Sequence, residues 1–452
     1  MVPNIIVMGI LNTKGEGIKF IRDKIIEAGG NPIVVEASLG EETNFDWVDY
    51  PIRKVLEHSG KTIEELFTTP RKEAATLVGE IAKDLVMDLY RQNKVDGIIA
   101  YAGATGTGLC TVAMRALPVG IPKFMLTTSA NQPLGWRFVG TKDLCLINPI
   151  AEMGVNRITR PLFSYAAYGI VGAASAPKEE ANKTKPLVGL SMFGVTTPCC
   201  LKAAKVMESY GNDTIIMHTT GMGGKCLEEQ IAEGNIAGLL DLTTHELWAH
   251  EVGGKEDAGP DRMLAAVTHG IPQVVAPGAL DFMLFETHNF PEKYKKEVET
   301  GVPGRNLYSH SDLIRCPGTT LEEIEIIAQL MANKLNKAHS APVSILVPMK
   351  GWSAADMYEG KLELGQAKPG PSAAWLPAAE RPDWSQRAVV FIETMKKYLD
   401  LDNPYIEMYQ VDKHLNEPAF AELAGNLLHT MMTNSWEKGA ITGLNYVERV
   451  SR

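Results

Sequence analysis

The chain has 452 residues, of which 45% are hydrophobic and 22% are charged, and its formal net charge is −10. A chain of this length exceeds one hydrophobic core, so we expect two domains, and its composition excludes a largely disordered protein. The negative charge argues against a broad surface for nucleic acid or for an anionic membrane. We expect neither of these as a partner.

The apolar segments and the cysteines predict the cellular compartment of the protein. No stretch reaches the roughly 18 consecutive apolar residues of a membrane helix. The apolar opening segment is interrupted by Asn12, Lys14 and Glu16, which is typical of a first strand and not of a targeting segment. The six cysteines show no CxxC spacing, so neither a disulfide framework nor a structural zinc site is expected. The sequence therefore predicts a soluble, cytoplasmic protein.

The first half of the chain alternates apolar runs with segments of helical periodicity. Its expected elements are a strand at 4–11, a helix at 18–28, a strand at 32–37, a helix at 71–92, a strand at 95–101, a helix at 111–116 and a strand at 123–126. Strands that alternate with helices in this way indicate a parallel sheet.

The same pattern restarts after a polar, proline-containing segment at 175–186. Its expected strands are 187–192, 214–218, 236–242, 271–276, 344–348 and a last one at 405–411. We therefore expect an α/β protein of two consecutive Rossmann-like, doubly wound domains with mainly parallel sheets and a cleft between them. The expected domains are 1–176 and 187–452, joined by a linker at 177–186. The second carries an inserted arm near 360–384 and a C-terminal helix from Pro418.

Ligands of open parallel sheets bind beyond the carboxyl ends of the strands. In the first domain, three segments at such ends combine glycines, hydroxyls and one lysine, which suits a phosphate beside a positive helix terminus. The candidate contacts are Thr13, Lys14, Gly103, Thr105, Gly106, Thr107, Thr127, Thr128 and Ser129. Segment 103–108 matches neither GxGxxG nor the P-loop. A tight βα turn also uses glycine and threonine for backbone geometry alone, so a structural role stays open.

The second domain has a comparable glycine-rich loop at 218–225, with a lysine in the first turn of the following helix. Its candidate substrate contacts are Thr196, Thr197, Gly221, Gly223, Gly224 and Lys225. Two facing loops fit a ligand held between the domains. One occupied loop and one structural loop fit the pattern equally well, since similar folds need not share function.

Other reactive side chains give weaker signals. His245 and His250 are five residues apart, whereas the zinc-binding HExxH motif needs four, so the segment predicts a helix with one exposed and one half-buried imidazole. Cys199 and Cys200 begin a helix, which fits either a nucleophile with a lowered pKa or small packing residues. The weak catalytic candidates are His218, Glu246 and His414. The sequence assigns no metal ligands.

Ten segments together resemble the Tm-one-like ATP-binding family, which is named after a tomato inhibitor of tobamovirus RNA replication. They are 9–16, 101–107, 114–123, 192–199, 218–224, 238–244, 253–262, 271–281, 347–353 and 412–421. The resemblance covers nearly the whole chain, in order, and implies two Rossmann-type domains that form a homodimer.

The resemblance also implies that ATP, with Mg²⁺, binds the first domain. The positions that correspond are Thr13, Lys14, Gly103, Thr105, Gly106 and Thr107. Two departures affect this site: Asn12 stands where an acidic residue is expected, and segment 102–108 is poorer in glycine than is usual. The 360–384 arm also fits the family poorly.

Three functional hypotheses follow. The first is an ATP-dependent or ATP-regulated enzyme that acts on a small organic acid in the interdomain cleft. The second is a non-catalytic ATP-binding interaction module in which nucleotide stabilises a dimer. The third is a nucleotide-free hydrolase or isomerase that uses His218, Glu246 and His414.

Overall fold

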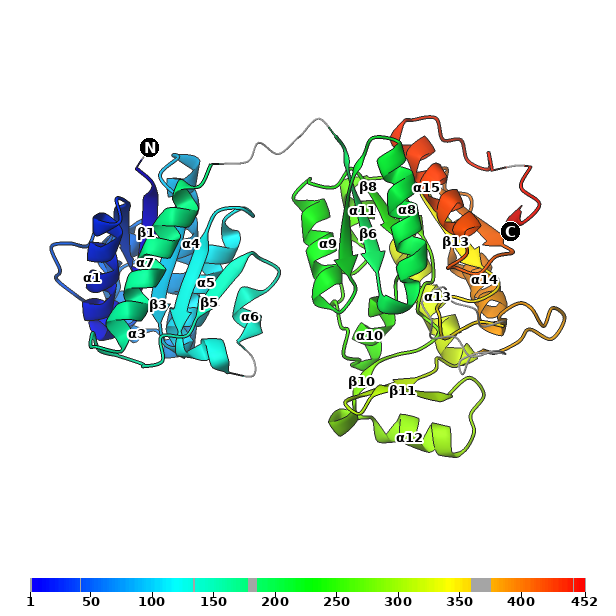
Figure 1. Cartoon of the computed structure of the whole chain (residues 1–452), viewed down its shortest axis with the longest axis horizontal. Helices are drawn as coiled ribbons and strands as arrows, with labels where there is room; N and C mark the ends of the chain where they lie inside the picture. The colour runs from blue at the N-terminus through cyan, green and yellow to red at the C-terminus, as the bar shows by residue number, and fades with distance from the viewer. Residues whose placement is uncertain are drawn as a thin grey trace. The chain divides into compact units, whose positions relative to one another are not determined.

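The structure of the chain is a computed structural model that describes residues 2–40, 42–132, 135–177, 185–358, 375–441 and 443–451, without the side chains of 308–310. The chain forms two compact units, 1–180 and 181–452 (Figure 1). Most of the predicted linker, at 178–184, and most of the predicted arm, at 360–374, lie outside the described residues.

The N-terminal unit is built on a five-stranded parallel sheet. Its strand order is β2-β1-β3-β4-β5, and every neighbouring pair is parallel. The strands are β1 (Asn4–Gly9), β2 (Asn31–Glu36), β3 (Gly97–Ala102), β4 (Lys123–Thr127) and β5 (Leu144–Ile147). This is the flavodoxin-like doubly wound order, in which the winding changes direction between β1 and β3.

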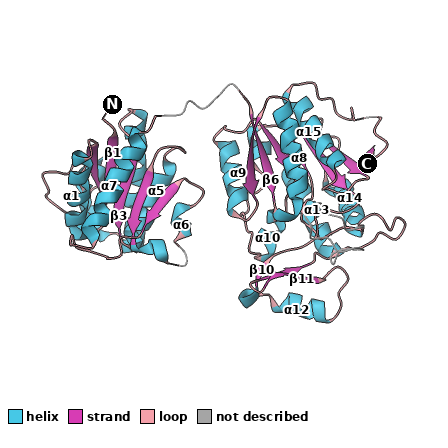
Figure 2. Ribbon diagram, viewed as in Figure 1, coloured by secondary structure: helices cyan, strands magenta, loops and turns pink. Residues whose placement is uncertain are grey.

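Helices cover both faces of this sheet (Figure 2). One apolar core joins the sheet to α1 (Leu11–Glu27) and α7 (Thr159–Ser175). The other joins it to α2 (Ile52–Glu57), α3 (Ile63–Thr68), α4 (Arg71–Arg91) and α5 (Ala104–Ala116). Both faces of the sheet are therefore buried, which explains the continuous apolar runs of its strands.

Two segments predicted as loops are the first turns of helices. Helix α1 begins at Leu11 and α5 begins at Ala104, directly after their strands. Glycine is a poor helix former, but close packing requires it here. A Cβ on Gly106 would lie 2.7 Å from the Ala102 side chain, and a Cβ on Gly17 would lie 2.7 Å from the Tyr101 ring. The predicted loop assignment was wrong because packing outweighed local propensity.

The C-terminal unit contains a seven-stranded sheet in the order β15-β14-β13-β9-β8-β6-β7. All neighbours are parallel except β14 and β15. The strands are β6 (Leu187–Met192), β7 (Asp213–His218), β8 (Gly238–Asp241), β9 (Gln273–Val275), β13 (Val343–Pro348), β14 (Ile406–Val411) and β15 (Val447–Arg449). The winding changes direction between β6 and β8. The predicted last strand at 405–411 is therefore followed by one more, antiparallel edge strand.

Helices also cover both faces of the second sheet. The helices α8 (Thr197–Ser209) and α15 (Pro418–Met432) share one apolar core. The opposite face packs against α9 (Met222–Ala232), α10 (Glu246–Val252), α11 (Ala265–His269), α13 (Leu321–Leu335) and α14 (Gln386–Tyr398). Two doubly wound α/β units with mainly parallel sheets confirm the predicted fold class.

A small antiparallel sheet was not predicted. It has the order β10-β12-β11, with β10 (Phe285–Glu286), β11 (Leu307–Ser311) and β12 (Ile314–Pro317), and lies beside α12 (Glu292–Glu299) (Figure 1). Strands of two to five residues are too short to show a clear alternating pattern. Within the described part of the chain, no helix is both long and apolar enough to cross a membrane.

Candidate functional site

The carboxyl edge between β1 and β3 brings together residues from three predicted segments of the N-terminal unit. Lys14 lies in the first turns of α1, and its side chain is only 4% exposed. The ammonium group forms an ion pair of 2.7 Å with a carboxylate oxygen of Glu152 and also contacts the Glu152 carbonyl oxygen. A buried cation therefore points at the edge where ligands of this fold bind.

Glu152 was not predicted as a site residue. Its second carboxylate oxygen accepts a hydrogen bond of 2.7 Å from the Thr128 hydroxyl, and its carbonyl accepts one of 2.8 Å from the Tyr101 hydroxyl. A Cβ on Gly103 would lie 2.4 Å from the carboxylate. The Glu152 carboxylate thus lies against the residue that precedes α5.

The ionisation of Glu152 reflects these contacts. Partial burial acts to raise its pKa, but hydrogen bonds from Lys14 and Thr128 outweigh burial and hold the pKa below its usual range. The carboxylate is therefore ionised at neutral pH. An internal anion sits at the start of α5, where the helix dipole is positive.

The remaining predicted ligand-contacting residues of the N-terminal unit differ in how far they are buried. Thr13 and Thr105 are exposed, whereas Gly106, Thr107, Thr127 and Ser129 are buried. The Thr107 hydroxyl lies 2.6 Å from the Thr127 hydroxyl and 2.9 Å from the Gly103 carbonyl, so these groups tie α5 to the end of β4. The Ser129 hydroxyl oxygen has no hydrogen-bond partner among the described residues.

A groove of 530 Å³ runs between α4 and α5. Its lining includes Thr105 and Gly108 from the predicted glycine-rich segment, the exposed cations Arg71 and Lys72, and the apolar Leu109 and Val112. Sequence reasoning missed the two cations. The only sequence feature that could have indicated them is their position at the start of α4, a helix that begins near the same carboxyl edge of the sheet.

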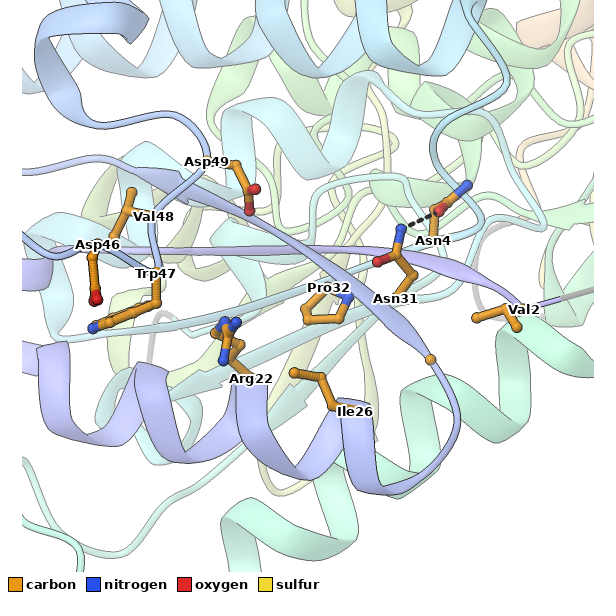
Figure 3. Close-up of a pocket in the computed structure, with 11 residues that line it drawn as sticks. Val2, Asn4, Arg22, Ile26, Asn31, Pro32, Asp46, Trp47, Val48 and Asp49 are labelled. Atoms are coloured by element: carbon orange, nitrogen blue, oxygen red, sulfur yellow. Dashed lines mark hydrogen bonds between the residues drawn. The ribbon is translucent and has the colours of Figure 1, made fainter.

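A larger pocket of 660 Å³ lies elsewhere on the N-terminal unit (Figure 3). Arg22 and Ile26 of α1, Pro32 of β2 and Trp47 line it, and Asn31 donates a hydrogen bond of 2.8 Å to the Asn4 side chain. Asn4 and Asn31 are the first residues of their strands. This pocket therefore reaches the amino ends of the strands and not the carboxyl edge.

In the C-terminal unit, an ion network surrounds the predicted glycine-rich loop. Arg262 is fully buried and pairs with Asp241 at 2.6 and 2.7 Å, with Glu246 at 2.9 Å and with Glu228 at 3.2 Å. Burial acts to lower the Arg262 pKa, but the carboxylates outweigh it, Asp241 foremost, and the pKa lies well above its usual range. Asp241 ends β8, so the network joins the sheet edge to α9 and α10.

The Glu246 carboxylate occupies the start of α9. It accepts hydrogen bonds from the backbone N–H groups of Gly221, at 2.7 Å, and Gly224, at 3.1 Å. A Cβ on Gly224 would lie 2.1 Å from its other oxygen, and a Cβ on Gly223 would lie 1.8 Å from the His218 carbonyl oxygen. Close packing therefore accounts for these glycines. Lys225 is half-buried in the first turn of α9.

The loop after β6 is held by buried hydroxyls and thiols. The Thr196 hydroxyl lies 2.8 Å from that of Thr243, and Thr197 donates to the Phe193 carbonyl. Burial raises the pKa of the Cys199 thiol, and it raises that of Cys200 to about 12. The interpretation as a nucleophile with a lowered pKa is therefore wrong, because burial outweighs the helix dipole.

The three weak catalytic candidates lie in different surroundings. Glu246 is the buried carboxylate described above. His414 is buried, with one ring nitrogen 3.1 Å from the Ser353 carbonyl and the other accepting from the Asn416 N–H, and burial lowers its pKa to about 4. His218 is exposed and stacks on Phe193 at 5.4 Å.

His245 was not among the predicted site residues. It is 3% exposed and lies 4.6 Å from the Phe193 ring, and among the described residues neither ring nitrogen makes a hydrogen bond of good geometry, although the Thr219 backbone lies close to the ring. Burial, with Arg262 and His218 adding to it, lowers its pKa to about 3, so the ring is neutral. The predicted pattern of one exposed and one half-buried imidazole was wrong, because His245 is buried and His250 is half-buried.

The part of the chain that the structure describes shows no cluster of metal-binding side chains. There, no group of three or more His, Cys, Asp and Glu side chains is arranged to hold an ion.

Comparisons with known proteins identify the family. The Uncharacterised protein family (UPF0261) N-terminal domain matches residues 3–179, and the corresponding C-terminal domain matches 185–432. A UPF0261 protein of Clostridium tetani is 34% identical over 96% of the chain and 100% of its own length.

Two further matches are more distant. The ToMV resistance protein Tm-1(GCR237) of Solanum lycopersicum is 29% identical over 78% of the chain and 48% of its own length, which confirms the resemblance stated above. A structure of Phytolacca americana UGT2 covers 61% of the chain at 13% identity with a TM-score of 0.19, too low to support an argument. The chain therefore belongs to the UPF0261 family.

Proposed function

We propose that the N-terminal unit binds ATP together with Mg²⁺ at the carboxyl edge between β1 and β3. The observation that carries this proposal is the contact between Lys14 and Glu152 at the start of α5. A buried ammonium group that faces an anion beside a helix N-terminus has the charge and the dipole that a phosphate needs.

The groove between α4 and α5 supports a position for the rest of the nucleotide. Its 530 Å³ fall within the roughly 300–1,000 Å³ of small-molecule pockets. Leu109 and Val112 offer apolar surface to a base, and Arg71, Lys72 and Glu80 offer charged groups to the polar parts of the nucleotide. Thr105 lines this groove and lies in the first turn of α5, so the groove borders the helix terminus at which the phosphates are proposed to bind.

Photolabelling of the full chain with 8-azido-ATP tests this location. We expect labelled peptides from 71–116, and we expect excess ATP to suppress the labelling. Saturable labelling confined to 185–432 would contradict ATP binding in the N-terminal unit. A Lys14→Met variant should lose labelling, whereas Lys19→Met, an exposed lysine on the same helix, should keep it.

The bound ATP serves an ATP-dependent or ATP-regulated enzyme that acts on a small organic acid. Phosphate release by the full chain, with and without a panel of small organic acids, tests this role. Release that depends on an acid supports an enzyme. ATP-dependent dimerisation in light scattering without phosphate release would instead support the interaction module in which nucleotide stabilises a homodimer.

A second candidate function is a nucleotide-free hydrolase or isomerase in the C-terminal unit. The specific observation in its favour is His245, a buried neutral imidazole without a hydrogen bond of good geometry among the described residues, which packs on Phe193 as does the exposed His218. Buried polar groups normally have partners, so a poorly paired one is a candidate for a binding or catalytic role. Thermal shift with small organic acids tests it: His245→Phe should abolish stabilisation, and the exposed His269→Gln should not.

A further inference from the structure

Both predicted anion-binding loops face a carboxylate of the chain itself. Glu152 lies at the start of α5 in the N-terminal unit, and Glu246 lies at the start of α9 in the C-terminal unit. A carboxylate is the natural partner of a helix N-terminus and carries the same sign of charge as a phosphate. A ligand anion therefore has to compete with an internal anion at each site.

The two carboxylates are held very differently. The Glu246 side chain has no exposed surface and binds Arg262 and two backbone N–H groups, so removing it would leave a buried cation without this partner. The Glu152 side chain is 56% exposed, and one cation and one hydroxyl hold its carboxylate. Because the Glu152 side chain is half in solvent, it can leave once a ligand anion replaces it as the partner of the buried Lys14 ammonium, so Glu152 is the carboxylate that a ligand is able to displace.

The side chains beside Glu152 are weakly packed, although its carbonyl oxygen is bound by Lys14 and Tyr101. The neighbouring side chains of Ile150 and Met153 are exposed, so they bury little apolar surface that would fix the segment. Ile150 has a φ of 66°, a left-handed conformation that is strained for a β-branched residue. Movement of the Glu152 side chain away from Lys14 therefore breaks one ion pair and the hydrogen bond from Thr128, and it leaves the contacts of the Glu152 carbonyl oxygen with Lys14 and Tyr101 in place.

We infer that Glu152 occupies the phosphate subsite of the N-terminal unit and competes with the ligand for Lys14 and Thr128. This inference rests on the proposed ATP binding. A phosphoryl group takes the place of the carboxylate, accepts hydrogen bonds from the Lys14 ammonium and the Thr128 hydroxyl, and gains from the dipole of α5. Glu152 swings into solvent at the same time. The competition applies to phosphate-bearing ligands and not to uncharged ones.

Calorimetric titration of the full chain with ATP, adenosine and pyrophosphate tests this inference. Glu152→Gln keeps the shape of the side chain and removes its charge. We expect it to strengthen ATP and pyrophosphate binding about tenfold, because a like charge a few ångströms from the phosphate is removed. Adenosine binding should not change. The matched control Glu57→Gln removes an exposed carboxylate on α2 and should leave all three affinities unchanged.

The other outcomes separate the two proposals. Equal ATP affinity in the parent protein and Glu152→Gln, or weaker binding by the variant, overturns the competition and leaves ATP binding intact. If Glu152→Gln binds pyrophosphate more tightly and neither protein binds ATP, the phosphate subsite is supported and the proposal that the ligand is a nucleotide is overturned. No binding of ATP or pyrophosphate by either folded protein overturns both proposals.

Discussion

Asp241 and Arg262 form a two-point ion pair, with N–O distances of 2.6 and 2.7 Å and no exposed surface on either side chain. Asp241 ends β8, and Arg262 lies beyond α10, so the pair fastens a long connection to the carboxyl edge of the C-terminal sheet. Glu228 and Glu246 bind the same guanidinium.

Arg262→Met should destabilise the C-terminal unit by about 3–5 kcal/mol, because it leaves buried carboxylates without their cation. Urea unfolding of the full chain, followed by far-UV circular dichroism, measures this loss. Arg53→Met removes the cation of an exposed pair with Glu42 and should have little effect. Similar unfolding curves for the two variants would contradict a structural role for Arg262.

Gly224→Ala should destabilise the chain by about 1–3 kcal/mol, since the new methyl group would lie 2.1 Å from the Glu246 carboxylate. A Cβ on Gly194 meets no atom within 4 Å, and its backbone does not have a left-handed φ, so Gly194→Ala should be close to neutral. Thermal unfolding of both variants checks the difference. A neutral Gly224→Ala would mean that the Glu246 carboxylate moves freely, against its fixed position between Arg262 and the N–H groups of Gly221 and Gly224.

Asp281 gives the C-terminal unit a pH-dependent stability. Burial, with Asp356 adding to it and Arg387 and the Ser353 hydroxyl opposing it, raises the Asp281 pKa to about 7. The folded chain therefore keeps a proton that the unfolded chain releases above about pH 4. This contribution is fully present below about pH 4 and is lost as the pH rises through about 7, in total about 4 kcal/mol.

Comparison with Asp281→Asn isolates this contribution. The free energy of unfolding of the parent protein minus that of the variant should be larger at pH 5 than at pH 8. Asp261→Asn, an exposed aspartate of the same unit, should show a constant difference. A constant difference for Asp281→Asn as well would show that Asp281 is ionised throughout.

His245 makes the free energy of unfolding depend on pH in the opposite direction. Its pKa in the folded chain is about 3, far below the roughly 6.5 of an unfolded histidine, so protonation favours unfolding. The contribution is present above pH 6.5 and is lost as the pH falls, by about 1.4 kcal/mol per pH unit. The stability of the parent protein relative to His245→Phe should therefore fall by about 2 kcal/mol between pH 6.5 and 5. His269→Gln is the control, and an unchanged difference contradicts the buried neutral ring.

Local patterns predicted two doubly wound units and most of their parallel strands, because buried parallel strands appear as short apolar runs between helices. Strand β5 and helix α7 were not predicted. The patterns also indicated that Lys14, Gly103 and Thr128 lie at one sheet edge, since parallel strands end there. The starts of α1 and α5 were missed because Gly17 and Gly106 are required by packing, which periodicity does not report.

Long-range partners had no local signal. Glu152 meets Lys14 across 138 positions, and Arg262 meets Asp241 across 21, so neither pair is visible as a motif. The glycines at 221–224 were interpreted as room for a phosphate, yet a chain carboxylate fills the space beside Gly224. Composition alone does not distinguish a glycine that admits a ligand from one that admits a side chain.

The most direct test of the central proposal is calorimetric titration of the full chain with ATP in the presence of Mg²⁺, beside its Lys14→Met and Lys19→Met variants. The account predicts one saturable site per chain, retained in Lys19→Met and lost in a folded Lys14→Met. No binding at millimolar ATP, or binding that survives the loss of Lys14, would contradict it.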